Sequence, residues 1–235
     1  WYISMNMNKA PFDNQLVRQA INYAIDRELI VETIACGSGQ AADAIIAPAV
    51  FGYSDPGEYT YDPEKAKALL AEAGWDGSKV LQFYVNSGDS TFVNAAAIMV
   101  AQWQAVGIKA EVKTVDFATL MAVSGTKDYD ILAVQYTYAP VDPYADMNWL
   151  LSGEGSWTGY YNEDVTAALA ATQTTMDTDE LTSLYSVVNK KVQEEVPMIS
   201  AYVISALGAK NKRLTVAEPS VYGFFNEVHN WDVTQ

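Results

Sequence analysis

A strand–helix–strand pattern occupies residues 80–115, which read VLQFYVNSGDSTFVNAAAIMVAQWQAVGIKAEVKTV. Residues 80–85 are mostly apolar and aromatic, as in a strand. The long uncharged run after them contains polar amides, so it predicts a buried helix over 91–106 rather than a membrane span. Gly107 ends that helix, and a period-two pattern follows over 108–115. Strands separated by a helix indicate an α/β layer with a crossover connection.

The same alternation of helices and strands extends on both sides of this pattern. Helical spacing and capping residues predict helices over 14–25, 27–35, 63–73, 116–124, 164–175 and from Asp177 or Asp179 to 192. Extended patterns predict strands over 1–8, 129–135 and 196–207, and residues 37–60 are expected to form a loop. The apolar run 129–135 is typical of a central strand, whereas the alternation of 1–8 predicts a half-buried one.

Composition excludes several classes of protein. The 235 residues include 14 Lys and Arg against 29 Asp and Glu, which gives a net charge of −15. Half of the residues are hydrophobic, so the chain is not of the disordered class. Phosphate and anionic lipid surfaces are bound through clustered basic residues, so we expect neither nucleic acid nor membrane binding of that kind.

Catalytic motifs are absent from the sequence. It has no G-x-S-x-G, P-loop or H-E-x-x-H pattern, and its single cysteine and single histidine, Cys36 and His229, are assigned structural roles. No cofactor and no metal are expected. Two pairs of acids, Asp128 with Asp130 and Asp142 with Asp146, leave a two-carboxylate hydrolase open as an alternative.

The clearest functional signal is an aromatic segment that follows the predicted central strand. Its rings are Tyr136, Tyr138, Tyr144, Trp149, Trp157, Tyr160 and Tyr161. Tyr and Trp combine apolar area with a polar group, and ligands of α/β sheets bind at the carboxyl ends of strands. We therefore expect at least one of these rings to contact a ligand. The alternative is that they fill a small core beneath a loop.

Three segments carry a resemblance to a known family. They are PFDNQLVRQAINYAIDR at 11–27, YTYDPEKAKALLAEAGW at 59–75 and WQAVGI at 103–108. In order and spacing they are similar to signatures of the extracytoplasmic solute-binding proteins of ABC importers, family 5, the oligopeptide, dipeptide and nickel group.

The resemblance implies an α/β fold: the C-terminal lobe of a two-lobe periplasmic-binding-protein-like fold (class II, cluster C), with a mixed sheet flanked by helices. Residues 1–10 would be a crossover strand from the N-terminal lobe. Residues 11–213 would form the ligand-binding lobe, and residues 214–235 would return toward the N-terminal lobe. On this view the chain is a piece of a protein of about twice its length.

The resemblance also implies a function. The intact protein would capture a solute, a peptide first of all, between its lobes and deliver it to the permease subunits of an ABC importer. It would not be an enzyme, would be monomeric, and would work outside the cytoplasm, in the periplasm or as a cell-surface lipoprotein.

The ligand anchors of the family's dipeptide binders are missing. Ala139 stands where an Asp, four residues before Pro143, would hold a peptide amino group, and Asn86 stands near the place of an Arg for the carboxylate. An unpaired charge in a closed cleft costs several kcal/mol, so a zwitterionic dipeptide is disfavoured. Longer peptides and a neutral oligosaccharide both stay open.

The predicted ligand-binding residues lie on three parts of the chain. The resemblance aligns Tyr136 with an aromatic cleft residue of the family. The remaining candidates are Tyr138 and Ala139 on the same loop, Asn86 and Ser87 at the end of the strand 80–85, and Trp157. Arg18 belongs to the first signature, and we expect it to form a structural ion pair within the lobe.

Overall fold

The computed structural model describes residues 1–35, 38–48, 50–57, 59–135, 142–153, 156–204, 211–215 and 232–233. The chain divides into two compact units, Trp1–Ile204 and Ser205–Gln235. In the second unit, strands β8 (Leu214–Thr215) and β9 (Asp232–Val233) pair antiparallel. Cys36 and His229 lie outside the described residues.

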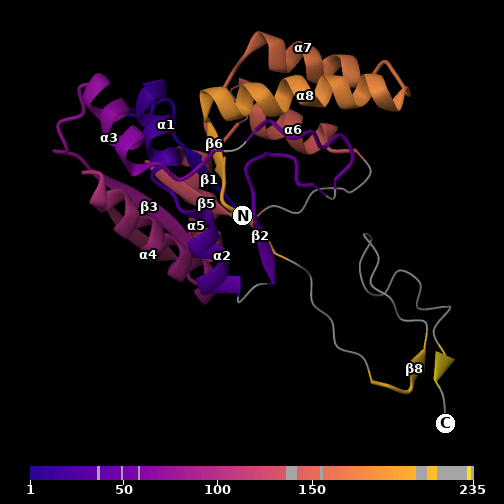
Figure 1. Ribbon diagram of the computed structural model, residues 1–235, viewed down its shortest axis with the longest axis horizontal. Helices are drawn as coiled ribbons and strands as arrows, with labels where there is room; N and C mark the ends of the chain where they lie inside the picture. The colour runs from indigo at the N-terminus through magenta and orange to yellow at the C-terminus, as the bar shows by residue number, and fades with distance from the viewer. Residues whose placement is uncertain are drawn as a thin grey trace. The chain divides into compact units, whose positions relative to one another are not determined.

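A five-stranded mixed sheet forms the centre of the first unit (Figure 1). Its strands, in spatial order, are β4 (Lys109–Val115), β3 (Val80–Asn86), β5 (Ile131–Val134), β1 (Tyr2–Met5) and β6 (Met198–Ser200). Strand β3 is parallel to both β4 and β5, whereas β1 is antiparallel to β5 and β6. The predicted central position of the strand within 129–135 is therefore confirmed.

Eight helices are described, and most begin where the sequence places a capping residue. They are α1 (Gln15–Tyr23), α2 (Arg27–Ala35), α3 (Pro63–Glu72), α4 (Ser90–Ala105), α5 (Phe117–Thr126), α6 (Tyr144–Leu151), α7 (Glu163–Thr172) and α8 (Thr178–Glu195). Asp62, Asp116 and Asp177 each accept a hydrogen bond from a first-turn backbone N–H. Asp177, rather than Asp179, caps the last helix. None of the helices in the described ranges is long and apolar enough to cross a membrane.

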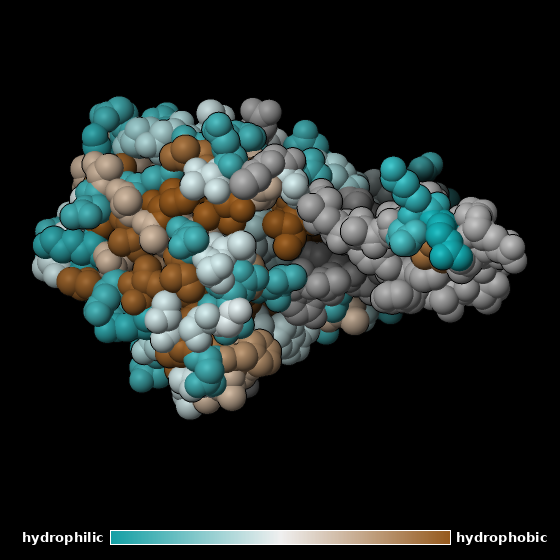
Figure 2. Space-filling model, turned by 90° about the horizontal axis from the view of Figure 1, so that it is seen from below, coloured by the Kyte–Doolittle hydropathy of each residue, from teal (hydrophilic) through white to brown (hydrophobic). Residues whose placement is uncertain are grey.

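Helices cover both faces of the sheet. Helices α1 to α4 pack on one face around Trp103, whose indole N–H donates to the carbonyl of Ile21 over 3.2 Å. Helices α5 to α8 pack on the other face around Tyr160 and Tyr185. Seen from below the view of Figure 1, apolar side chains of the surface gather among polar ones (Figure 2). The mixed sheet flanked by helices agrees with the predicted fold class.

The prediction of a half-buried first strand is wrong. All four residues of β1 are buried, because Ile3 and Met5 face the α1–α4 core while Tyr2 faces the α5–α8 core. The hydroxyl of Tyr2 donates to the carbonyl of Ile45 over 2.8 Å, and the Ser4 side chain is also fully buried. Polar side chains on alternate positions therefore face a second core and not solvent.

Two further predictions are corrected. The expected loop 37–60 contains β2 (Gly39–Ala41), which pairs antiparallel with β7 (Tyr202–Ile204) in a separate sheet. The expected strand 196–207 is consequently two strands, β6 and β7, with Ala201 between them. Helix α6 lies within the aromatic segment and was not predicted, because its N-cap is Pro143, which supplies no capping hydrogen bond.

Arg18 holds the start of α1 to the end of α8. It is buried, and its guanidinium donates to the carbonyls of Phe12, Glu195 and Val196 at 2.7 to 3.2 Å. The role is structural, as expected, but its hydrogen-bond partners are backbone carbonyls where an ion pair was predicted.

Candidate functional site

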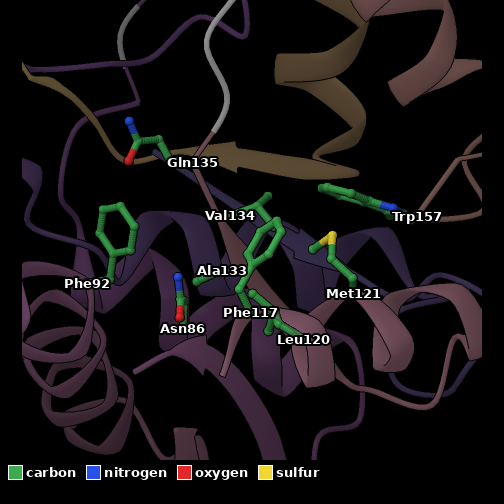
Figure 3. Close-up of a pocket in the computed structure, with 9 residues that line it drawn as sticks. All are labelled: Asn86, Phe92, Phe117, Leu120, Met121, Ala133, Val134, Gln135 and Trp157. Carbon is green, nitrogen blue, oxygen red and sulfur yellow. The ribbon is translucent and has the colours of Figure 1, made fainter. Parts of the chain in front are cut away.

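A pocket of about 410 Å³ opens at the carboxyl ends of β3 and β5 (Figure 3). It is lined by Asn86, Phe92, Phe117, Leu120, Met121, Ala133, Val134, Gln135 and Trp157. The volume falls within the roughly 300–1,000 Å³ of small-molecule sites. Open α/β sheets bind ligands at this kind of edge, so the pocket is the candidate site.

Parallel pairing brings the lining residues together. Phe83 pairs with Ile131 and Tyr84 with Leu132, so β3 and β5 end at the same edge of the sheet. The turns that leave β3 and β4 at that edge lead into α4 and α5. Helix α4 contributes one lining residue, Phe92, and α5 contributes three.

Both helices are fixed at the edge by an acidic cap. Asp89 accepts hydrogen bonds from the backbone N–H and hydroxyl of Thr91, at 2.8 and 2.5 Å. Asp116 accepts the equivalent pair from Thr119, both at 2.9 Å. The bonds from Thr119 lower the pKa of Asp116 below its usual value. Each helix N-terminus is therefore already matched by a carboxylate of the chain itself.

Asn86 is the last residue of β3, and Ser87 begins the turn that follows it. The Asn86 Oδ1 accepts from the Gly88 N–H over 3.0 Å, and the Ser87 N–H donates to the Val115 carbonyl over 2.7 Å. These bonds hold the Asn86 side chain at the pocket wall. Ser87 is exposed and is not among the lining residues.

Trp157 borders the pocket near Met121 (Figure 3). Its ring meets Trp149 edge-on, with 4.6 Å between ring centroids and 77° between ring planes. Its backbone carbonyl accepts from the hydroxyl of buried Tyr129. The backbone of Trp157 is thus held by Tyr129 and its ring by Trp149, which favours a fixed stacking surface.

No ionisable side chain appears among the described residues that line the pocket. The next segment, 136–141, reads YTYAPV and carries no charge either. Tyr136, Tyr138 and Ala139 belong to it and lie outside the described residues. Asp142, the first charged residue after it, accepts from the hydroxyl of Tyr185 over 2.6 Å.

Most of the pocket wall was not predicted from the sequence. Of its residues, Asn86 and Trp157 were predicted, whereas the apolar residues of α4, α5 and the end of β5 were not. One signal was available: Phe117 directly follows the capping residue Asp116 at the end of a predicted strand, and a large apolar side chain there is conspicuous. Phe117 is 62% exposed.

The acids of the hydrolase alternative do not line the pocket. Asp128 and Asp130 precede β5, at the strand end opposite the pocket, and Asp142 is bonded to Tyr185. Asp130 precedes β5, forms an ion pair with Lys79 at 2.8 Å and accepts from the Gln82 N–H over 3.0 Å. Asp128 forms an ion pair with Lys9 at 3.0 Å. Within the described ranges there is also no cluster of His, Cys, Asp and Glu able to hold a metal ion.

Comparison with known proteins gives consistent matches. Residues 1–158 match the family described as bacterial extracellular solute-binding proteins, family 5. Heme-binding protein A of Haemophilus influenzae is 38% identical over 122 residues, which cover 50% of this chain and 22% of that protein. The glutathione-binding protein GsiB of Escherichia coli K12 is 31% identical over 225 residues, which cover 91% of this chain and 44% of that protein.

Solved structures share the fold. CtaP, an ABC transporter substrate-binding protein of Listeria monocytogenes, superposes with a TM-score of 0.89 at 24% identity, covering all of this chain and 50% of that one. The oligopeptide-binding protein AppA of Bacillus subtilis, solved with a nonapeptide, gives 0.84 at 20% identity with the same coverage. The chain spans half or less of the length of these proteins. Its first 158 residues and its fold together place it in family 5 of the bacterial extracellular solute-binding proteins.

Proposed function

We propose that this chain is the ligand-binding lobe of the substrate-binding component of an ABC importer, and that its solute is a peptide. The observation that carries the proposal is the pocket of about 410 Å³ at the carboxyl ends of β3 and β5. The family membership supports importer function, and relatives whose names refer to peptides and glutathione support a peptide.

In the full-length protein, this pocket would be one wall of a cleft between two lobes. Residues 1–10 would cross from the N-terminal lobe, residues 11–213 would form the present lobe, and residues 214–235 would return. These crossing segments would act as a hinge, and closure of the two lobes about it would enclose the solute for delivery to the permease subunits. The protein would act outside the cytoplasm, as a monomer, and would release its solute chemically unchanged.

The identity of the solute can be tested directly. Full-length protein is purified under mild conditions and denatured, and the released ligand is identified by mass spectrometry. Recovery of peptides supports the proposal, whereas recovery of oligosaccharides overturns the peptide assignment. Hydrolysis of a peptide or glycoside by the purified protein would overturn the binding function itself.

A neutral oligosaccharide is the second candidate. The observation that favours it is that the Trp157 ring and two carboxamides, those of Asn86 and Gln135, line the same uncharged pocket. Aromatic rings and amides suit sugar rings and hydroxyls. The same mass-spectrometric measurement separates the two candidates.

The position of the site is tested with the ligand so identified. Trp157→Ala is expected to weaken affinity about tenfold, since an aromatic contact contributes roughly 0.5–1.5 kcal/mol beyond its area. Tyr136→Ala, from the adjoining segment, is expected to do the same. Tyr161→Ala removes an exposed ring that is not among the pocket residues and should leave affinity unchanged. Unchanged affinity in both of the first two variants would place the site elsewhere.

A further inference from the structure

We propose that the pocket takes an uncharged apolar group of the bound solute, an aromatic or long aliphatic side chain of a peptide, and discriminates against charged side chains. This inference rests on the proposed function and specifies which ligand chemistry the site selects.

The lining residues give the first argument. Seven of the nine are apolar: Phe92, Phe117, Leu120, Met121, Ala133, Val134 and Trp157. They surround a volume that holds one large side chain together with part of its backbone. An apolar group placed there leaves water, which is favourable, whereas a charged group would lose its hydration without gaining a partner.

The helix N-termini give the second argument. Two of them, those of α4 and α5, follow the strands that end at the pocket edge, and a helix N-terminus ordinarily attracts an anion. Here Asp89 and Asp116 each already accept one first-turn N–H, from Thr91 and Thr119 respectively. A ligand carboxylate would therefore compete with the capping carboxylate at each helix start and would be repelled by two like charges nearby.

The polar lining residues give the third argument. Asn86 offers a carboxamide whose oxygen is engaged by the Gly88 N–H, and Gln135, the exposed residue directly after β5, offers another. Neither residue is charged. The sequence of 136–141 adds no charge, wherever its side chains lie. The polar groups therefore suit the peptide backbone of a ligand, not an ionised side chain.

The proposal is tested with the full-length protein and a pool of randomised tetrapeptides. Endogenous ligand is first removed by reversible denaturation, and retained peptides are then separated by gel filtration and identified by mass spectrometry. We expect about tenfold enrichment of Phe, Tyr, Trp, Leu and Met at one peptide position, with depletion of Asp, Glu, Lys and Arg at that position.

A charge swap makes the test specific to this pocket. Phe117 is 62% exposed, so Phe117→Lys is expected to fold, and circular dichroism melting verifies it. This variant should lose the apolar enrichment and retain peptides with Asp or Glu at the same position. Tyr161 is equally exposed at 62% but is not among the pocket residues, so Tyr161→Lys is the matched control and should select as the wild type does.

The outcomes separate the inference from the proposed function. Peptides retained without apolar enrichment, or a selection that Phe117→Lys and Tyr161→Lys alter equally, would overturn the inference and leave peptide binding intact. Retention of no peptide at all would overturn the peptide function, and the inference would fall with it.

Discussion

Replacing Arg18 with methionine should destabilise this lobe severely, although Arg18 lies on a different element from every residue of the pocket. Arg18 as a residue is 3% exposed, and its guanidinium makes four hydrogen bonds to three backbone carbonyls, those of Phe12, Glu195 and Val196. Methionine has a similar length but no donor. The substitution therefore leaves three largely buried acceptors unbonded at the junction of α1 and α8.

The magnitude follows from those acceptors. A buried acceptor without its partner costs about 1–3 kcal/mol, so three would cost roughly 3–9 kcal/mol. Part of this is offset, because burial lowers the pKa of Arg18, which means that burying the charged guanidinium is itself unfavourable. We expect a net loss of about 3–5 kcal/mol, as is typical when one partner of a buried charged interaction is removed.

Urea unfolding of the full-length protein, followed by circular dichroism, measures the effect. With a slope near 3 kcal/mol/M, the expected loss lowers the midpoint by about 1–2 M. Arg18→Lys, which keeps the charge but can donate to fewer carbonyls, should fall between wild type and Arg18→Met. Gln19→Ala is the control, since Gln19 makes one exposed bond, 2.8 Å long, to the carbonyl of Glu194. The reasoning is refuted if Arg18→Met shifts the midpoint no more than Gln19→Ala.

Two further predictions concern packing and pH. A Cβ on Gly52 would lie 2.3 Å from Cδ2 of Tyr185, whereas one on Gly74 would meet nothing within 4 Å, and both glycines have positive φ. Gly52→Ala should therefore lower the melting temperature by about 10 °C and Gly74→Ala by only about 2–5 °C; equal shifts would contradict the clash. Burial also raises the pKa of Tyr129, Tyr160 and Tyr185 above the unfolded value near 10. Their stabilising contribution is complete below pH 10 and is lost as the pH rises further, so the urea midpoint should fall between pH 10 and 12. Ionisation of every tyrosine near pH 10 in the folded protein, followed by tyrosinate absorbance, would contradict this.

Much of the secondary structure could be predicted because its signals are local. Asp62, Asp116 and Asp177 cap helices that begin within one or two residues of the predicted positions. A capping side chain accepts a hydrogen bond from the backbone two or three residues away, so the residues that form the interaction can be recognised within a short stretch of sequence. Helix α6 was missed for the same reason, since Pro143 supplies no such bond.

Burial on both faces of the sheet was not predictable from the pattern of β1. Its alternation of apolar and polar side chains indicated a solvent-facing side, yet Tyr2 and Ser4 are buried. The second face is covered by α5 to α8, which come more than a hundred residues later in the chain. Period two in a strand reports which side chains share a face, but only the packing of distant elements decides what covers that face.

The sequence by itself determined the α/β class and the family resemblance, because both depend on residue types at short spacing, and it predicted a ligand at the carboxyl ends of the strands. Only the tertiary structure decided the composition of the pocket wall. Asn86, Phe117 and Trp157 lie far apart in the chain and come together where the parallel pairing of β3 with β4 and β5 aligns the strand ends. The wall is uncharged because strand pairing between distant segments brings these particular residues together. Short-range spacing in the sequence does not show which distant strands will pair.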